Sequence, residues 1–370
     1  MVNGKSNSME TNNIPFDQYS RQLIVKNIIE RVIKKREEVR ENGKLKILDV
    51  GGYKGLTAEF MDKDSVKVLD VFDVAEDNYI MGDATNMSFE DDSFDLVCSF
   101  DVFEHIPREK RESFIKECAR VSRIGFFIAA PVDDNQKLVS FAEEKANNIF
   151  KIVNNEDHRW LKEHIEYGIP TNSDIEAIMK KEKLKWTSTQ SNELKKWLLM
   201  QSGFFLKSVL DSETNFLHRS YTKEFLELHE SLDGFYNKNY EFLDLQDGGV
   251  AYRTVYFASD NSKLISEVEE YLIQIISNRS KNQKKIEKLT LELQVKVFET
   301  VAKTISLMQL AGSNLEIKIK NNADEISHQK KIIDELTKKI YSIQNSRSWR
   351  VTKPLRYSQS IIKNIIERRH

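Results

Sequence analysis

The spacing of apolar side chains divides the first third of the chain into one helix and a series of short strands. Apolar residues recur every three or four positions through residues 16–41, which predicts an amphipathic helix, and Asn42-Gly43 is typical of a helix end. Runs rich in Val, Ile and Phe follow without strict alternation, as in strands that are buried on both faces. These runs are residues 46–50, 65–72, 94–100 and 124–132, with a shorter strand at 79–81.

Helical stretches at residues 56–63 and 108–121 separate these runs. An alternation of strand and helix predicts a mostly parallel sheet with helices on both faces. Beyond Pro131 the spacing predicts helices at 137–152, 172–182, 192–206 and 223–240, and strands at 184–189 and 252–258. Residues 158–170 (HRWLKEHIEYGIP) mix aromatic, charged and histidine side chains and fit neither pattern.

The last third of the chain has a different character. Between residues 261 and 345 apolar positions alternate steps of three and four, most clearly from Ile319 to Ile343, which predicts a coiled coil. The final residues combine apolar and basic positions at helical spacing, and the first fifteen are polar. We therefore expect a disordered N-terminus (1–15), a globular domain (16–260), a coiled coil (261–345) and a basic amphipathic tail (346–370).

Charge follows the same division, although the formal net charge is only −2. Residues 1–259 carry 35 Lys+Arg and 45 Asp+Glu, a balance of −10, whereas residues 260–370 carry 21 and 13, a balance of +8. Cys98 and Cys118 are too few for a disulfide framework or a four-cysteine zinc site. No apolar run is long enough to cross a membrane, and the polar first residues do not look like a signal peptide. We expect a cytoplasmic protein.

The first predicted strand runs into a glycine-rich turn, residues 49–55 (DVGGYKG), and a helix follows. Such a turn lets a ligand approach the backbone closely, and a tight turn without a ligand is the alternative. Asp70 comes about 20 residues later, where doubly wound folds place a carboxylate on a ribose hydroxyl. Asp73 is a nearby competitor for that role. Asp83 and Asp101 then follow the next two strands, so acidic residues recur at one edge of the sheet.

These elements, in this order, resemble the class I S-adenosylmethionine-dependent methyltransferases of the type 11 subgroup. The matching segments are ILDVGGYKG (47–55), VLD (68–70), GDATNMSF (82–89), DDSFDLVCSFDVFEHIP (91–107) and FFIAAP (126–131). The resemblance implies an α/β fold with a Rossmann-like, mostly parallel seven-stranded sheet and S-adenosyl-L-methionine as the cofactor. It places the cofactor half at 44–132 and the acceptor or lid insertions at 133–250. Tyr53 departs from the family's usual Asp-x-Gly-x-Gly-x-Gly turn, because it replaces the middle glycine.

The resemblance also implies a role for individual residues. Asp49 would lie near the ammonium group of the cofactor, and Asp70 would accept both ribose hydroxyls, since a carboxylate has two acceptor oxygens. Asp83 would accept a hydrogen bond from the adenine amino group. The residues implied to bind the cofactor are Asp49, Gly51, Gly52, Gly55, Asp70, Asp83, Ala84 and Phe100.

Methyl transfer to a hydroxyl is helped by a general base near the methyl group. Candidates are Asp101, Glu104 and His105 after the fourth strand, and His158, His164 and Glu166 after Pro131. We assign the role of base to Asp101, His105, His158 or His164, and for each histidine a purely structural role is the alternative. Histidine has the intrinsic pKa for this task. We expect no metal site, because the two cysteines and the histidines do not form a convincing ligand set.

Two further resemblances indicate the acceptor. Residues 158–171 are similar to the region after the fifth strand in methyltransferases encoded beside bacterial surface-polysaccharide genes, and Trp160 and Tyr167 in it suit stacking on a sugar ring. Residues 348–356 (SWRVTKPLR) resemble the ends of many bacterial surface-glycan glycosyltransferases. They imply O-methylation of a sugar or glycan hydroxyl, with a glycan or glycan-lipid as the acceptor. The alternatives are a methyltransferase for a small metabolite or a protein side chain, and a non-catalytic coiled-coil scaffold, which Tyr53 keeps open.

The sequence of the C-terminal third indicates binding partners and contains no catalytic motif. The coiled coil predicts a homo-oligomer or a coiled-coil partner. Residues 346–370 predict peripheral contact with an anionic membrane face, with a solvated basic end or a helix that packs back on the coil as the alternative. We expect no nucleic-acid partner, because the globular body is acidic and lacks an RNA-binding module.

Overall fold

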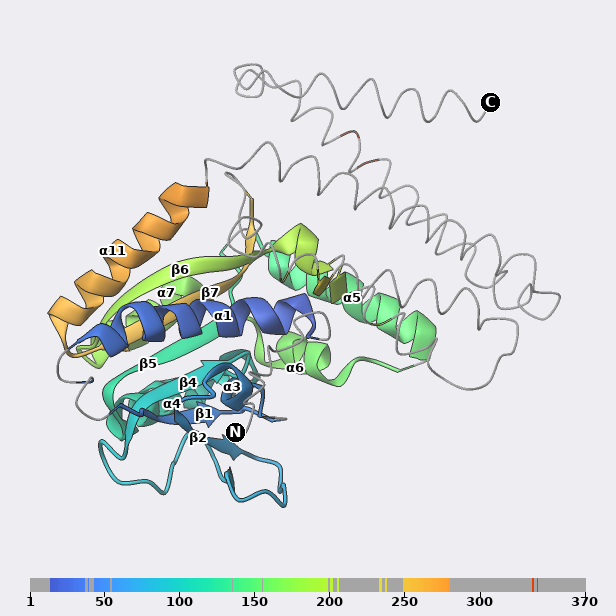
Figure 1. Cartoon of the computed structure of the whole chain (residues 1–370). Coiled ribbons are helices and arrows are strands. Elements are labelled where there is room, and N and C mark those ends of the chain that lie inside the picture. The colour runs from blue at the N-terminus through green and yellow to red at the C-terminus, as the bar shows by residue number, and fades with distance from the viewer. Residues whose placement is uncertain are drawn as a thin grey trace, which may run out of the picture. The chain divides into compact units, whose positions relative to one another are not determined.

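The computed structural model of the chain (Figure 1) describes residues 14–36, 39, 43–198 and 249–279, apart from 54, 135 and 155, with single residues at 200, 201, 205, 233, 234, 237, 335 and 338. The chain forms two compact units, residues 1–297 and 298–370. Every helix and strand described below belongs to the first unit.

Seven strands form one sheet in the order β3-β2-β1-β4-β5-β7-β6. Strands β1 to β5 pair in parallel, and β7 runs antiparallel to both of its neighbours. The mostly parallel seven-stranded sheet expected from the sequence is therefore confirmed. The strands are β1 (Lys46–Val50), β2 (Ser65–Asp70), β3 (Tyr79–Met81), β4 (Phe94–Phe100), β5 (Ser122–Pro131), β6 (Lys185–Glu193) and β7 (Ala251–Ser259).

Successive side chains of the central strands enter two separate hydrophobic cores. Ile47 of β1 and Phe127 of β5 join a core with helices α1 and α11, whereas Leu48 and Phe126 join a core with α4 and α7. The strands read as continuous apolar runs because both faces are buried in this way. The covering helices are α1 (Phe16–Arg31), α4 (Arg111–Val121), α7 (Asn172–Lys181) and α11 (Ser262–Arg279).

Helices α5 (Leu138–Asn154) and α6 (Arg159–Tyr167) lie together beside the sheet, as Figure 1 shows. Leu161 of α6 joins a third hydrophobic cluster with Val139 of α5 and with Trp197, which stacks on Tyr252 of β7. Only Leu161 and His164 of α6 are buried. The sequence predicted no element for residues 158–170, and the structure shows that residues 159–167 of this segment form α6.

Several of the predicted elements have different limits in the structure. The helix predicted for residues 16–41 ends at Arg31, and a 3-10 turn (Ile33–Lys35) follows, which buries Ile33 and brings Arg36 to an ion pair with Glu267 of α11 at 2.6 Å. The predicted helix 108–121 is a 3-10 turn (Arg108–Lys110) followed by α4. Residues 192 and 193 continue β6 instead of starting a helix, and Glu193 pairs with Ala251 of β7.

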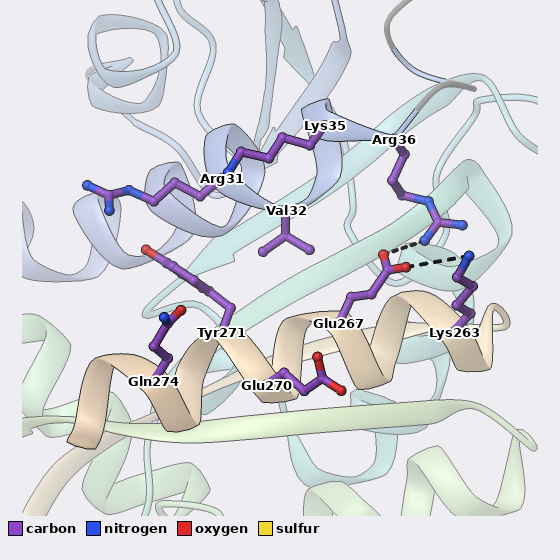
Figure 2. A pocket seen from close by; sticks show the side chains of 9 residues that line it. All are labelled: Arg31, Val32, Lys35, Arg36, Lys263, Glu267, Glu270, Tyr271 and Gln274. Carbon is purple, nitrogen blue, oxygen red and sulfur yellow. Dashed lines mark hydrogen bonds and ion pairs between the residues drawn. The ribbon is translucent and has the colours of Figure 1, made fainter. Parts of the chain in front are cut away.

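The first part of the predicted coiled coil packs on the sheet. Leu264, Val268 and Leu272 of α11 are buried in the same core as α1. A groove lies between the C-terminal end of α1 and α11, lined by Arg31, Val32, Lys35, Arg36, Lys263, Glu267, Glu270, Tyr271 and Gln274 (Figure 2). It lies apart from every residue that the sequence assigned to the cofactor or to catalysis.

The remaining predictions for the C-terminal third lie outside the described residues. These are the coil beyond residue 279, except for residues 335 and 338, and the basic tail 346–370. The same holds for residues 1–13 and for most of the helix predicted at 223–240. Of the helix predicted at 192–206, residues 194–198, 200, 201 and 205 are helical, and residues 199, 202–204 and 206 lie outside the described residues. Within the part of the chain that the structure describes, no helix is long and apolar enough to cross a membrane.

One ionic cluster joins elements from distant parts of the sequence at the carboxyl edge of the sheet. Asp101, directly after β4, accepts hydrogen bonds from Arg21 of α1 and from Arg253 of β7. Arg253 also donates to Asp17 of α1 at 3.1 Å, and Asn192 of β6 donates to Asp17 at 2.6 Å. Arg253 is 0% exposed. A buried guanidinium needs carboxylate partners, so this cluster fixes how α1 and β7 meet the end of β4.

We predict that Arg253→Gln lowers the free energy of unfolding by about 3 kcal/mol, because it leaves two carboxylates short of a buried partner. Urea unfolding followed by tryptophan fluorescence measures the change. Lys263→Gln is the control, since Lys263 is 81% exposed and its 3.9 Å ion pair with Glu267 is worth less than about 1 kcal/mol. Equal unfolding midpoints for the two variants would contradict the prediction.

Candidate functional site

The glycine-rich turn after β1 brings the backbone close to two other segments. A Cβ at Gly51 would lie 2.3 Å from the Val102 side chain, and a Cβ at Gly52 would lie 2.0 Å from Asp49 Oδ2. Gly51 and Gly55 have φ angles of 74° and 66°, a region that favours glycine. The glycines thus allow the loop after β4 and the Asp49 carboxylate to lie directly against the turn.

Asp49 is buried beneath this turn. Its Oδ1 atom has no hydrogen-bond partner within the described residues, while the Thr57 hydroxyl hydrogen-bonds the carboxylate. Burial raises the pKa of Asp49 to about 6, partly offset by Thr57 and by the positive charge of Arg21. Leaving a buried carboxylate oxygen without a donor is costly. Asp49 is therefore prepared for a cationic or hydrogen-bond-donating ligand.

Asp70 lies at the end of β2 and accepts two backbone N–H groups. Tyr53 N donates to Oδ2 at 3.1 Å, and Phe72 N donates to Oδ1 at 3.3 Å. Each carboxylate oxygen keeps further acceptor capacity. The side chain of Tyr53 is 53% exposed, and its ring lies 5.6 Å from that of Phe72. The residue that replaces the middle glycine therefore directs its ring outward, while its backbone orients Asp70.

The other residues assigned to the cofactor lie along the same edge of the sheet. Asp83 follows β3 and accepts hydrogen bonds from the backbone and hydroxyl of Thr85, which lower the pKa of Asp83. Its side chain is exposed, and Lys110 lies 3.6 Å away. Ala84 is half-buried beside it, and Phe100 is buried at the end of β4. Asp49, Asp70, Asp83 and Phe100 each stand at or just beyond a strand end, which for parallel strands is one edge of the sheet.

Asp101 is held too firmly by cations to be an effective base. Burial alone would raise its pKa, but Arg21 and Arg253 hold the pKa of Asp101 at about 2. A carboxylate with so low a pKa accepts a proton poorly near neutral pH. The φ angle of 53° at Asp101 also turns the chain sharply into the segment that carries Glu104 and His105.

His105 and His164 face each other across two elements. Their Nε2 atoms are 3.1 Å apart, His105 in the 3-10 turn Phe103–His105 and His164 in α6. Each ring presents its Nδ1 atom to a carboxylate: His105 to Glu163 at 2.9 Å, and His164 to Glu143 of α5 at 2.8 Å. Glu143 in turn accepts a hydrogen bond from the Tyr252 hydroxyl at 2.8 Å.

The two imidazoles have opposite electrostatic environments. Burial, and then the neighbouring His164, lower the pKa of His105 to about 3. Burial opposes the charge of His164 as well, but the carboxylates of Glu143, Glu104 and Asp101 together outweigh burial and raise the pKa of His164 to about 9. At neutral pH the His164 ring, beside Glu143, is therefore positively charged and the His105 ring is neutral.

Glu104 is the third member of this cluster, and it lies next to His164. It is 0% exposed, and within the described part of the chain neither of its carboxylate oxygens accepts a hydrogen bond from another residue. Its Oε1 lies 3.8 Å from His164 Nε2. Burial and the nearby Asp101 raise the pKa of Glu104 to about 8. One ligand atom each from Glu104, His105 and His164 lies within 4.8 Å of the others.

His158 lies outside this cluster. Its ring packs against Phe150 and Phe205, with centroids 4.8 and 4.9 Å away, and burial lowers the pKa of His158 to about 4. Of the four candidate bases, the structure brings together His105 and His164, places Asp101 in the arginine cluster, and places His158 in an aromatic cluster.

Several residues of the site were missed from the sequence. Arg253 is the lone charge in the apolar run YRTVYFA, and Glu143 lies four positions after the buried Val139 of α5. A charge at a buried position of a strand or helix is a signal for an internal partner. Glu104 and His164 were considered separately, since nothing in their spacing of 60 residues indicates contact.

The family described as "Methyltransferase domain" matches residues 48–129. One similar solved structure is the YcgJ protein from Bacillus subtilis, with 14% identity over 60% of this chain and 94% of that chain and a TM-score of 0.34. Another is the [4+2]-cyclase SpnF, with 14% identity over 66% of this chain and 80% of that chain and a TM-score of 0.37. A third is a SAM-dependent methyltransferase from Methanosarcina mazei, with 16% identity over 42% of this chain and 89% of that chain and a TM-score of 0.29. A comparison with curated protein sequences finds no match. The prediction of a methyltransferase that uses S-adenosylmethionine is confirmed by the family match.

The residues at the turn fit this cofactor. Asp49 offers an unpartnered buried oxygen to an ammonium group, and Asp70 keeps acceptor capacity on both oxygens for ribose hydroxyls. The absence of a Cβ at Gly51 and Gly52 lets Val102 and the Asp49 carboxylate pack directly against the turn. When bound, S-adenosylmethionine supplies the transferable methyl group, and the protein supplies its position.

We predict that the affinity for S-adenosylmethionine falls about tenfold between pH 7.5 and pH 5. Asp49, with a raised pKa of about 6, is ionised above that pH and protonated below it, and only the carboxylate attracts an ammonium group. Calorimetric titrations across this range measure the dissociation constant. Asp49→Asn should bind more weakly and lose most of the pH dependence. If the dissociation constant of Asp49→Asn changed with pH as steeply as that of the wild type, another group would be responsible for the pH dependence.

Proposed function

We propose that this S-adenosylmethionine-dependent methyltransferase methylates a hydroxyl of a sugar or glycan. The observation that carries the proposal is an exposed aromatic surface beside the histidine pair. Trp160 is 40% exposed, and its ring packs edge-on against His105 with centroids 5.3 Å apart. An exposed indole next to polar side chains suits a sugar ring, which has apolar faces and hydroxylated edges.

Helix α6 links this surface to the cofactor turn. Arg159 lies over the Trp160 ring at 4.7 Å and over the Phe72 ring at 5.5 Å. Phe72 N donates to Asp70, the residue assigned to the ribose. An acceptor resting on Trp160 would therefore lie within reach of the cofactor, and Arg159 could donate hydrogen bonds to its hydroxyls.

The loop after β4 connects the two halves of the site. Val102 packs against Gly51 of the turn, and the 3-10 turn with Glu104 and His105 begins one residue later. The acceptor hydroxyl must approach the methyl group in line with the bond that breaks, so orientation by rigid elements is the main contribution of the protein. We propose that the acceptor hydroxyl lies on the same side of this loop as His105. The other candidates are engaged elsewhere, since Asp101 is hydrogen-bonded to Arg253 and His158 packs on Phe205.

The scaffold alternative rested on Tyr53, and the arrangement of that residue supports the enzyme instead. Its ring is directed to solvent and its backbone N–H orients Asp70, so a side chain at this position leaves Asp70 in place. A small-metabolite or protein acceptor remains the alternative within the enzyme class. We further propose, from the sequence alone, that residues 346–370 hold the protein at an anionic membrane face.

The proposal predicts that the purified enzyme transfers methyl groups from S-adenosylmethionine to sugars. A panel of sugar nucleotides, oligosaccharides, glycan-lipids, small phenols and peptides, with product mass measured, identifies the acceptor. Trp160→Ala should raise KM for the glycan about tenfold, a loss of ~1.4 kcal/mol, without changing the affinity for S-adenosylmethionine.

Ile165→Ala is the matched control, because Ile165 is 59% exposed and lies on another side of the same helix. It should behave as the wild type. Methylation of a phenol or peptide with no glycan product would overturn the proposed acceptor, as would an unchanged glycan KM in Trp160→Ala.

A further inference from the structure

The structure assigns a divalent transition-metal site to Glu104, His105 and His164. This goes beyond the proposed function, because methyl transfer from S-adenosylmethionine does not itself require a metal. Zinc and related divalent ions in enzymes are bound by sets of this kind, which consist of two imidazole nitrogens and one carboxylate oxygen. The ion then keeps a further coordination position open.

The distance between the two imidazoles suits a shared ion. Ligand atoms bound at about 2.1 Å lie roughly 3.4 Å apart in tetrahedral geometry and roughly 3 Å apart at the right angles of octahedral geometry. His105 Nε2 and His164 Nε2 are 3.1 Å apart. Glu104 Oε1 is 3.8 Å from His164 Nε2, so a small side-chain movement completes a three-ligand set.

The Nδ1 atoms of both rings are held in the way that metal-bound histidines are held. Glu163 contacts His105 Nδ1 and Glu143 contacts His164 Nδ1, which leaves each Nε2 directed at the other ring. A carboxylate on the far nitrogen fixes the ring and raises its basicity toward a metal. Tyr252 donates to Glu143, so one of these supporting carboxylates is itself fixed.

Glu104 gives an independent reason to expect a ligand. Its carboxylate is fully buried, and neither oxygen accepts a hydrogen bond from another of the residues that the structure describes, although the side chain points to the histidine pair. A buried carboxylate without donors is costly unless a cation is bound. The alternative is a hydrogen-bonded histidine pair that shares one proton, in which Glu104 has only the longer, 3.8 Å ion pair with His164.

An ion at this position would be accessible from the acceptor side. The His105 side chain is partly exposed and lies beneath Trp160. The open coordination position would then face the surface proposed for the acceptor, where a hydroxyl oxygen could become the fourth ligand. The metal site does not depend on the acceptor's being a sugar.

Metal binding by the full-length chain tests the assignment without an acceptor. After removal of metals with a chelator, Zn²⁺ is titrated by calorimetry, and Co²⁺ is titrated by its visible absorption. We expect one ion per chain, with ligand-field bands in the cobalt form. Glu104→Gln and His164→Ala should each weaken Zn²⁺ binding at least 100-fold, and Glu143→Gln should weaken it roughly 10- to 100-fold.

His158→Gln is the matched control, since His158 lies in the same segment but outside the cluster. It should bind Zn²⁺ as the wild type does. Circular dichroism checks that each variant is folded, and Glu104→Gln keeps the side-chain shape if His164→Ala does not fold. Failure of the wild type to bind Zn²⁺ or Co²⁺, or equal affinity in the wild type and Glu104→Gln, would overturn the assignment and leave the proposed function untouched.

Discussion

The Asp101 carboxylate, held by Arg21 and Arg253, is the interaction on which the site depends. It joins the first helix, the central strand β4 and the antiparallel strand β7 at one point on the carboxyl edge of the sheet. The left-handed backbone at Asp101 directs the following residues across the glycine turn, where Val102 meets Gly51. If this ionic cluster were displaced, the turn and the histidine pair would lose their common support.

Two other buried carboxylates have the opposite character, because they lack the partners that Asp101 has. Asp49 lies under the glycine turn and Glu104 lies under the histidine pair, each with unpartnered oxygen. Burial raises the pKa of both, to about 6 and about 8. A folded protein tolerates such groups where a ligand compensates them. The cofactor's ammonium group is the partner for Asp49, and the divalent ion is the partner we propose for Glu104.

The sequence predicted the elements that depend on local pattern. Strand β4 was predicted at its observed limits, and β1 was predicted residue for residue, since continuous apolar runs mark strands that are buried on both faces. The glycine turn and Asp70 were located by their order and spacing along the chain. The contacts of His105 and His164 could not be predicted, because they join a loop after β4 to a helix that has only two buried positions. Asp101 was assigned as a base because no local signal places Arg21 and Arg253 beside it.

The central claim is that the turn of residues 49–55, with Asp70 and Asp49 beside it, binds S-adenosylmethionine. Calorimetric titration of the full-length protein with S-adenosylmethionine, alongside Asp70→Ala, tests this claim most directly. The account predicts one binding site per chain in the wild type and an affinity at least tenfold weaker in Asp70→Ala, a loss of ~1.4 kcal/mol or more. A wild-type protein that gives no binding, or a variant that binds as tightly as the wild type, would contradict it.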